Sequence, residues 1–138
     1  MNKVKLVFAG HDLKFAKLII DYLENSGKYE VRIDHWKGHN AHDEAYSKEC
    51  ISWADVIICE WGLGNAVWYS QHKLPHQKLI VRMHRQELDT QYPKKFVLGN
   101  IDKIIAISPY VYEEFYRVFK IPREKMIMIY NAVHSQML

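Results

Sequence analysis

Three apolar runs in the last third of the chain, each followed by a polar residue, constrain its fold more than any other feature. They are residues 79–83 before His84, residues 103–107 before Ser108, and residues 126–130 before Asn131. Short apolar runs separated by helical patterns are typical of the buried strands of a parallel sheet. Ligands bind such sheets just outside the carboxyl ends of the strands. The sequence therefore predicts a ligand site near His84, Ser108 and Asn131.

The same alternation of strand and helix patterns extends over the rest of the chain. Earlier strands are expected at residues 4–9, 29–33 and 55–60. Asp12 is expected to cap the first helix, and Ser108 the last, where Pro109 occupies the first helical position. This alternation predicts an α/β protein with an open, doubly wound parallel sheet, a three-layer α/β/α arrangement of the Rossmann-like kind. Right-handed crossovers then favour the strand order 3-2-1-4-5-6.

Length and charge limit the classes of function that are open to the chain. Its 138 residues suffice for a single domain, spanning 1–138, with its own core. The net charge of +3 and the lack of any run of Lys and Arg argue against nucleic acid as a partner. The mild positive charge is compatible with anionic ligands or with loose association with an acidic membrane surface.

The cysteines and the apolar segments indicate the compartment. Cys50 and Cys59 are the only two cysteines, and Cys59 lies within an apolar run, which favours buried free thiols in a reducing environment. No stretch has the apolar core of a signal peptide or the ~20 residues of a membrane span. We therefore expect a cytoplasmic protein, with membrane contact limited to peripheral association at the inner face.

The turn after the first strand, residues 9–12, contains Gly10 and His11. A glycine there allows a ligand or another loop to approach the backbone closely, and the following helix N-terminus favours anions. The residues after Gly10 do not continue the G-x-G-x-x-G fingerprint of dinucleotide sites, and the P-loop motif is absent as well. A simple tight turn and a ligand-binding loop both remain open.

Glu60, Trp61 and Gly62 stand at the end of the third expected strand. A carboxylate, an indole and a glycine there suit the wall of a polar cleft, because they can hydrogen-bond hydroxyls and stack on a flat ligand. The structural alternative is that Trp61 packs under the neighbouring helix while Glu60 pairs with Arg82 or Arg85. We favour the cleft wall.

His84 and Arg85 follow the fourth expected strand. A histidine at this place can donate a hydrogen bond to a bound group or exchange a proton with it near neutral pH. Arg85 can hold a phosphate or a carboxylate. A single histidine is more often structural, so the residues alone leave both roles open for His84.

His35, His39, His42 and Asp43 form the densest group of metal-type ligands. Their spacing, H-x3-H-x2-H-D, matches no common zinc pattern. A solvated loop explains them better, and no metal is expected. The G-x-S-x-G motif of serine hydrolases is absent too, so helix capping accounts for Ser108.

Five short segments, taken in chain order, follow the pattern of one known family. They are Gly10 after the first strand, A-D-V-I-I-C-E-W-G at 54–62, L-I-V-R-M-H at 79–84, D-K-I-I-A-I-S at 102–108 and I-Y-N-A-V at 129–133. The chain thereby resembles the N-terminal domain of a family-4-type, or group 1, glycosyltransferase of GT-B architecture. Arg85 and Ala132 depart from this pattern, which has glycine at both places. Glu60 replaces a histidine, and His134 an aspartate.

The resemblance implies a division of labour between two domains. The N-terminal domain holds a sugar or lipid-linked acceptor, and a second Rossmann-like domain, absent from these 138 residues, binds the nucleotide-sugar donor. Transfer in the cleft between them retains the anomeric configuration and uses no metal or other cofactor. His84 is then the catalytic residue, which contacts the transferred sugar or stabilises the departing diphosphate.

The resemblance also implies a set of binding residues and a function. The expected substrate-binding residues are Gly10, His11, Glu60, Trp61, Gly62, Arg85, Ser108 and Asn131. The expected function is the acceptor-binding half of a retaining glycosyltransferase that acts on a cell-surface polysaccharide or glycolipid and is inactive alone. The alternative is a stand-alone nucleotide- or ligand-binding module, or a partner subunit, with a Rossmann-like fold.

Overall fold

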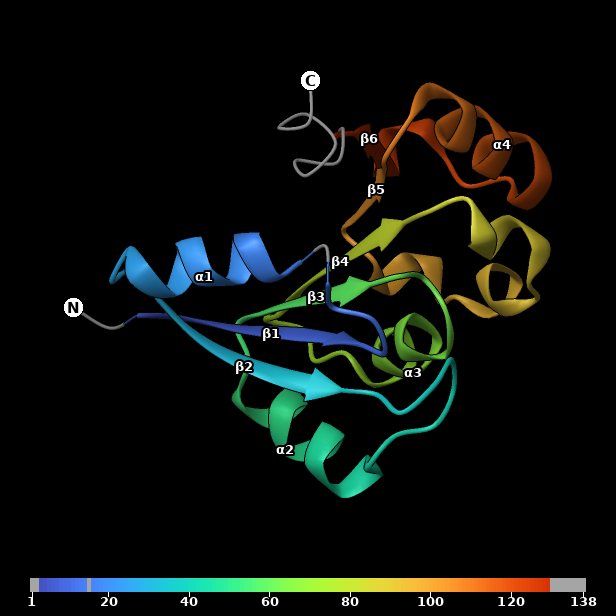
Figure 1. Cartoon of the computed structure of the whole chain (residues 1–138). Helices are drawn as coiled ribbons and strands as arrows, with labels where there is room; N and C mark the ends of the chain where they lie inside the picture. Colours follow the sequence, from blue (N-terminus) through green and yellow to red (C-terminus); the bar gives the residue numbers. More distant parts are fainter. Residues whose placement is uncertain (1–2, 15, 130–138) are drawn as a thin grey trace.

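The computed structural model describes residues 3–14 and 16–129 of the chain. Within them, six strands form one all-parallel sheet in the order β2-β1-β3-β4-β5-β6 (Figure 1). The strands are β1 (Val4–Gly10), β2 (Tyr29–His35), β3 (Val56–Glu60), β4 (Lys78–Met83), β5 (Lys103–Ala106) and β6 (Met126–Met128). The α-helices are α1 (Lys17–Asn25), α2 (Glu44–Trp53), α3 (Gly64–His72) and α4 (Pro109–Phe119). Short 3-10 helices are η1 (Gln86–Asp89), η2 (Tyr92–Lys95), η3 (Leu98–Asn100) and η4 (Arg123–Lys125). The predicted open, parallel α/β sheet is confirmed.

The predicted strand order 3-2-1-4-5-6 is wrong, because β3 lies beside β1 and β2 lies at the edge. The two strands differ in composition. β2 alternates apolar and charged residues, and only Asp34 of its seven residues is buried. β3 is apolar except for its last residue, Glu60, and is buried or half-buried throughout. An edge strand tolerates charged side chains better than an interior strand does, so β3 takes the interior place.

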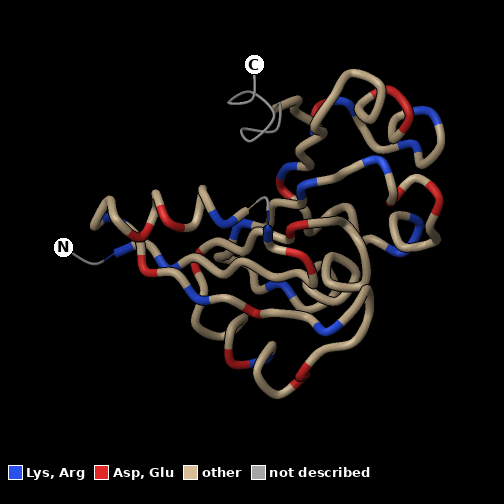
Figure 2. Tube along the Cα trace, in the orientation of Figure 1, with Lys and Arg blue, Asp and Glu red and all other residues tan. Residues whose placement is uncertain are grey.

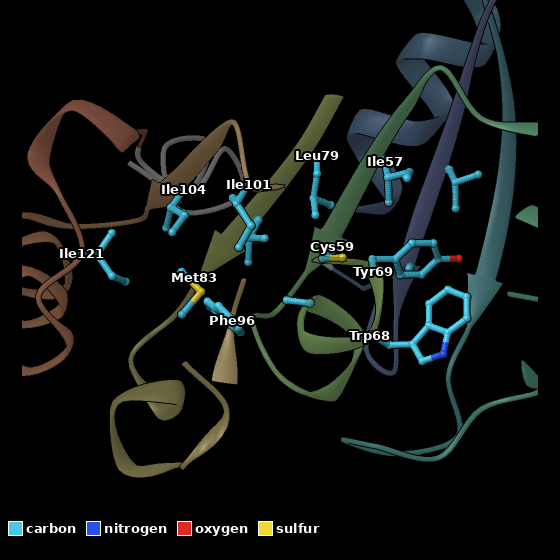
Figure 3. Packing of buried hydrophobic residues seen from close by; sticks show 14 of the residues in the cluster. Ile57, Cys59, Trp68, Tyr69, Leu79, Met83, Phe96, Ile101, Ile104 and Ile121 are labelled. Atoms are coloured by element: carbon cyan, nitrogen blue, oxygen red, sulfur yellow. The ribbon is translucent and has the colours of Figure 1, made fainter. Parts of the chain in front are cut away.

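Helices cover both faces of the sheet. Helix α1 lies on one face (Figure 1). Its residue Ile20 belongs there to a small apolar cluster that includes Phe8 of β1. On the other face α2, α3 and α4 contribute to a larger cluster, part of which is shown in Figure 3. Its centre contains Ile57, Leu79 and Ile104 from three neighbouring strands, each 0% exposed. The predicted three-layer arrangement is therefore present.

Helix α2 begins directly after the His-rich segment, where the sequence shows little helical periodicity. Its buried residues are Ser47, Cys50 and Ile51, so its inner face is not a continuous apolar stripe and the helical period is weak. The carboxylate of Asp43 caps the helix by accepting the N–H of Tyr46 at 3.1 Å. The helix is thus defined by its cap and by its packing rather than by its periodicity.

The two predicted helix caps have different outcomes. Ser108 caps α4 as predicted, since its Oγ accepts the N–H of Val111, and Pro109 is the first helical residue. Helix α1 begins only at Lys17. Asp12, which the sequence predicted as its cap, instead accepts a hydrogen bond from the N–H of Lys14 at 3.1 Å inside the β1–α1 loop.

Cys50 and Cys59 are both buried and form no disulfide, as predicted. Burial raises the pKa of both thiols, that of Cys50 to about 11, so neither is a thiolate at neutral pH. Among the described residues, no helix has the length and apolar character needed to cross a membrane.

Candidate functional site

The carboxyl ends of β3 and β4 bring charged side chains together. Glu60 and Arg82 are partners in the β3–β4 ladder, and the guanidinium of Arg82 donates to the carboxylate of Glu60 in a buried ion pair. His84 follows β4, and its Nε2 lies 3.5 Å from Oε1 of Glu60. All three residues are 8% exposed or less. The structure therefore shows the pairing of Glu60 with Arg82 that the sequence allowed as the alternative to a cleft wall, and it places His84 beside this pair.

Burial controls the charge of Glu60. The loss of water around its carboxyl group raises its pKa, and the opposing effects of Arg82 and His84 do not cancel this rise. A carboxyl group with a raised pKa can take up or release a proton closer to neutral pH than an exposed glutamate can. A perturbed carboxyl at a strand end makes this group of residues a candidate functional site.

Trp61 covers the ring of His84. The two rings are stacked, with centroids 3.8 Å apart and planes 18° apart. The indole N–H also donates to the backbone oxygen of Asp12 at 3.1 Å. Trp61 has a φ of 70°, in the left-handed region that non-glycine residues adopt only when their surroundings impose it. Since Trp61 is 8% and His84 5% exposed, broad contact between a ligand and either ring requires the indole to move.

Glu87 is a central residue of the site that the sequence pattern did not indicate. Its Oε2 accepts the backbone N–H groups of Gly62 and His84, both at 2.9 Å, and lies 3.6 Å from Nδ1 of His84. It thereby joins the β3–α3 loop to the loop after β4. Gly62 is also packed so closely that a side chain there would overlap Met83. In the sequence, Glu87 is one of several polar residues after His84 and nothing distinguishes it.

Gly10 ends β1 beside β3, where the strand order of the sheet changes direction. A Cβ atom on Gly10 would lie 2.5 Å from the carbonyl oxygen of Glu60. The side-chain amide of Asn65 joins the same strands, because it donates to the carbonyl oxygens of Ala9 at 2.8 Å and of Glu60 at 3.1 Å. Such a change of direction is the usual ligand crevice of an open α/β sheet. The Gly10 loop and Glu60 therefore meet at the place where open α/β sheets form such a crevice, and we call this place the crevice.

His11 extends the site away from the sheet. Its ring centroid lies 5.9 Å from that of Trp61 and 4.9 Å from that of His39. Burial is the main cause of a lowered pKa at His11, and His39 lowers it further. At neutral pH His11 is therefore mainly an uncharged hydrogen-bond partner.

Two of the predicted binding residues lie toward α4. Arg85 is exposed, and its guanidinium carbon is 5.6 Å from the ring centroid of Tyr110. The Ser108 hydroxyl accepts the N–H of Val111 as the helix cap. Asn131 lies outside the described residues. The residues that the structure gathers at the crevice are Gly10, His11, Glu60, Trp61, Gly62 and His84.

The histidines at the end of β2 and in the loop after it contact different partners. Nε2 of His35 lies 3.0 Å from the backbone oxygen of His11. His42 stacks on Trp36, and its Nδ1 lies 2.7 Å from the hydroxyl of Ser47. In the part of the chain that the structure describes, no three His, Cys, Asp or Glu side chains are placed to hold a metal ion.

Asp34 is the centre of a second buried polar group. Its Oδ2 accepts hydrogen bonds from Nε1 of Trp36 at 3.2 Å, from the hydroxyl of Ser47 at 2.6 Å and from that of Tyr69 at 2.6 Å. Burial, and then the charge of Asp34, raises the pKa of Tyr69. These bonds tie α2 and α3 to β2, so the group has a structural role.

Charged residues of both signs are spread along the trace rather than gathered in one region (Figure 2).

No family model, curated protein or solved structure matches this chain. The function is therefore inferred from the side chains at the carboxyl ends of β1, β3 and β4.

Proposed function

We propose that this chain is the acceptor-binding half of a retaining glycosyltransferase, which transfers a sugar from a nucleotide-sugar donor to a cell-surface polysaccharide or glycolipid. The observation that carries the proposal is the position of Glu60, Trp61 and His84 beside the Gly10 loop, where the strand order changes direction. Carboxylate, imidazole and indole groups together can hydrogen-bond hydroxyls and pack against the flat face of a sugar ring. The resemblance of five sequence segments to group 1 glycosyltransferases supports the same function.

His84 has the catalytic role in this proposal. Its ring lies between two buried carboxylates, with Nε2 3.5 Å from Glu60 and Nδ1 3.6 Å from Glu87. Contacts on both sides hold the ring in one orientation, which is what a positioned catalytic group requires. An imidazole can donate a hydrogen bond to the transferred sugar or to the departing diphosphate once one of its nitrogens faces the ligand. Trp61 covers the face of the ring and the two carboxylates lie beside its nitrogens, so we expect ligand binding to displace the indole and to turn one nitrogen away from its carboxylate.

The acceptor contacts belong mainly to the crevice. We assign them to Gly10, His11, Glu60, Trp61 and Gly62. Arg85 is exposed beside the crevice and can turn from Tyr110 toward a phosphate or carboxylate of the ligand.

The donor belongs to another part of the enzyme. A donor-binding domain, in the same polypeptide or in a partner chain, binds the nucleotide sugar. The reaction needs no resident cofactor. We place it in the cytoplasm, with peripheral association of the protein at the inner face of the membrane.

The indole N–H of Trp61 offers a direct test. The chain is labelled with ¹⁵N and titrated with oligosaccharides and glycolipid head groups, and separately with sugar nucleotides. An acceptor saccharide should shift the Trp61 resonance and leave that of Trp36, whose N–H is bonded to buried Asp34, in place. A panel of saccharides without any effect on Trp61 contradicts the proposal. Turnover of a sugar nucleotide by the 138-residue chain alone would contradict its assignment as only the acceptor-binding half of the enzyme.

The catalytic role of His84 is tested in the enzyme assembled with its donor domain. His84→Ala should lower kcat by roughly 100-fold or more, as expected when a general acid or electrostatic group is removed. The KM for the acceptor should change much less, because the crevice residues remain. An unchanged kcat would assign His84 a structural role only.

The alternative function is a stand-alone ligand-binding module or partner subunit. It is favoured by one observation, a groove of about 680 Å³ between α1 and β2 that is lined by His11 but by no other residue of the crevice. It predicts binding of a small molecule in that pocket and no response of Trp61 to any saccharide.

A further inference from the structure

A groove of about 680 Å³ lies between helix α1 and the edge strand β2. Small-molecule sites in proteins commonly have volumes of this order. The groove is formed by the β1–α1 loop, by one side of α1 and by the end of β2. From Lys14 in the loop onward along α1, the lining side chains change from basic to apolar to acidic. This order determines which ligand fits.

The floor of the groove is apolar and incompletely covered. Ile20 of α1 is buried, whereas Ile33 of β2 is 43% exposed. Ile33 pairs with Phe8 in the β1–β2 ladder, and Phe8 packs in the cluster under α1. Paired residues in a sheet point to the same face, so the side chain of Ile33 lies on the α1 side. An apolar group that covers Ile33 would therefore gain free energy from the buried area.

The end of the groove beside the β1–α1 loop is basic. Lys14 and Lys17 line it together with His11, His35 and one carboxylate, that of Asp12, so the two lysines leave this end with a net positive charge. No ion pair within residues 3–14 and 16–129 involves either lysine. Because burial and the nearby His39 lower the pKa of His11, His11 adds little positive charge to this end at neutral pH.

The acidic residues of the groove lie further along α1. Asp21 and Glu24 line it beyond Lys17. At the rise of an α-helix they follow Lys17 by about 6 Å and about 10 Å along the axis. The groove thus offers a cationic end and a short apolar floor, and a second anionic group at its far end would be repelled.

We propose that this groove binds a single anionic amphiphile, with its phosphate or carboxylate between Lys14 and Lys17 and its apolar chain over Ile20 and Ile33. Lysine ammonium groups bind such anions as point charges, and burial of the chain supplies further affinity. The groove adjoins the proposed sugar-transfer crevice at His11, which lines the groove, but the inference does not depend on that function. A flat acidic membrane fits less well, because it would bring Asp21 and Glu24 against like charge.

Octyl phosphate, used below its micelle-forming concentration, is the probe. Calorimetric titration of the 138-residue chain compares it with inorganic phosphate, octanol and octyltrimethylammonium. Octyl phosphate should bind about tenfold more tightly than each of these. Inorganic phosphate lacks the alkyl chain, octanol lacks the charge, and octyltrimethylammonium carries a positive charge. Absence of octyl phosphate binding overturns the proposal, and so does equal binding of octyltrimethylammonium.

Substitution of the lysines tests the basic end. Lys14→Gln/Lys17→Gln should weaken octyl phosphate binding by roughly tenfold or more, because both cations are removed. Lys48→Gln/Lys94→Gln is the matched control, since both of these lysines are exposed and lie outside the groove. Circular dichroism verifies that both variants are folded. Equal binding by the two double variants overturns the assignment.

Substitution of an isoleucine tests the floor. Ile33→Ser should weaken octyl phosphate binding several-fold and leave the weak binding of inorganic phosphate unchanged. Ile19→Ser is the matched control, because Ile19 is 39% exposed, close to the 43% of Ile33, and lies outside the groove. Equal effects of the two substitutions contradict a site on the floor.

Vesicles of acidic phospholipid distinguish a soluble amphiphile from a membrane surface. Any co-sedimentation of the chain with such vesicles should be the same for the wild type and for Lys14→Gln/Lys17→Gln. If the two substitutions release the chain from vesicles but leave octyl phosphate binding unchanged, the basic end contacts a lipid surface and the proposal is overturned.

Discussion

The imidazole of His84 is stacked on the indole of Trp61, with 3.8 Å between the ring centroids and 18° between the planes. This contact joins two loops, because His84 follows β4 and Trp61 follows β3. The indole N–H extends the connection to the β1–α1 loop through its hydrogen bond to the oxygen of Asp12. One indole therefore holds three loops of the candidate site, and its position decides whether a ligand reaches His84.

Trp61→Ala should destabilise the fold by about 3–5 kcal/mol, the usual cost of removing a buried tryptophan. Trp61→Phe keeps a ring against His84 but loses the N–H donor to Asp12 and part of the buried ring, so its cost should be about 2 kcal/mol. Urea unfolding followed by circular dichroism measures both free energies. Equal losses would show that the hydrogen bond, and not the ring contact, holds the loops.

Glu87→Ala should destabilise the fold strongly. The substitution leaves the buried N–H groups of Gly62 and His84 without their acceptor, which should cost about 2–5 kcal/mol. Glu87→Gln retains an acceptor oxygen and should lose less than half as much. Thermal unfolding gives the difference, with Asp89→Ala in the same 3-10 helix as the control. A fully stable Glu87→Ala would show that water can replace the carboxylate.

The position of Glu60, Trp61, Gly62 and His84 at one edge of the sheet could be predicted from the sequence. These residues close two apolar runs, and parallel strands end at the same edge. The strand order could not be obtained in this way, because crossover handedness permits either β2 or β3 at the sheet edge. The deciding difference is the charge of β2, which makes it the strand that tolerates an edge.

Glu87, Asn65 and Asp34 could not be predicted as parts of buried polar groups. Each forms hydrogen bonds with residues that are distant in the sequence. Glu87, for example, bonds to Gly62, and Asn65 bonds to Ala9. A single polar residue in a loop or at a strand end produces no periodic pattern. Only the packing of the loops shows which of several equivalent polar residues is buried.

Gly10→Ala should disturb the contact between β1 and β3. The new Cβ atom would lie 2.5 Å from the carbonyl oxygen of Glu60, and this backbone atom cannot rotate away as a side chain could. Local separation of the strands should cost about 1–3 kcal/mol. Gly99→Ala is the matched control, since its Cβ would meet no described atom within 4 Å. The same loss of urea stability in both variants would indicate a general effect of replacing glycine.

His42 should make the stability of the fold depend on pH. It is stacked on Trp36 and hydrogen-bonded to Ser47, and burial lowers its pKa from 6.5 although Asp34 and Glu44 oppose the shift. Just below pH 6.5 the unfolded state therefore binds more protons at this position than the folded state does. The stabilising contribution is complete above pH 6.5 and is lost as the pH falls through the lowered pKa.

The measurement compares the unfolding free energies of the wild type and of His42→Gln at several values from about pH 8 to about pH 5. The advantage of the wild type should shrink as the pH falls below 6.5. A constant difference over the whole range would show that protonation of His42 is not coupled to folding.

The buried pair of Glu60 and Arg82 should show strong coupling in a double-mutant cycle. Glu60→Leu alone leaves the guanidinium of Arg82 buried without its partner and should cost about 3–5 kcal/mol. Arg82→Met alone should cost less, because the Glu60 carboxyl, whose pKa burial already raises, can become neutral by protonation. The double variant removes both buried charges and should be more stable than Glu60→Leu. If the free-energy losses of the two single variants sum to that of the double variant within about 0.5 kcal/mol, the two charges are not coupled. The electrostatic argument for a perturbed carboxyl group at Glu60, beside His84, would then be lost.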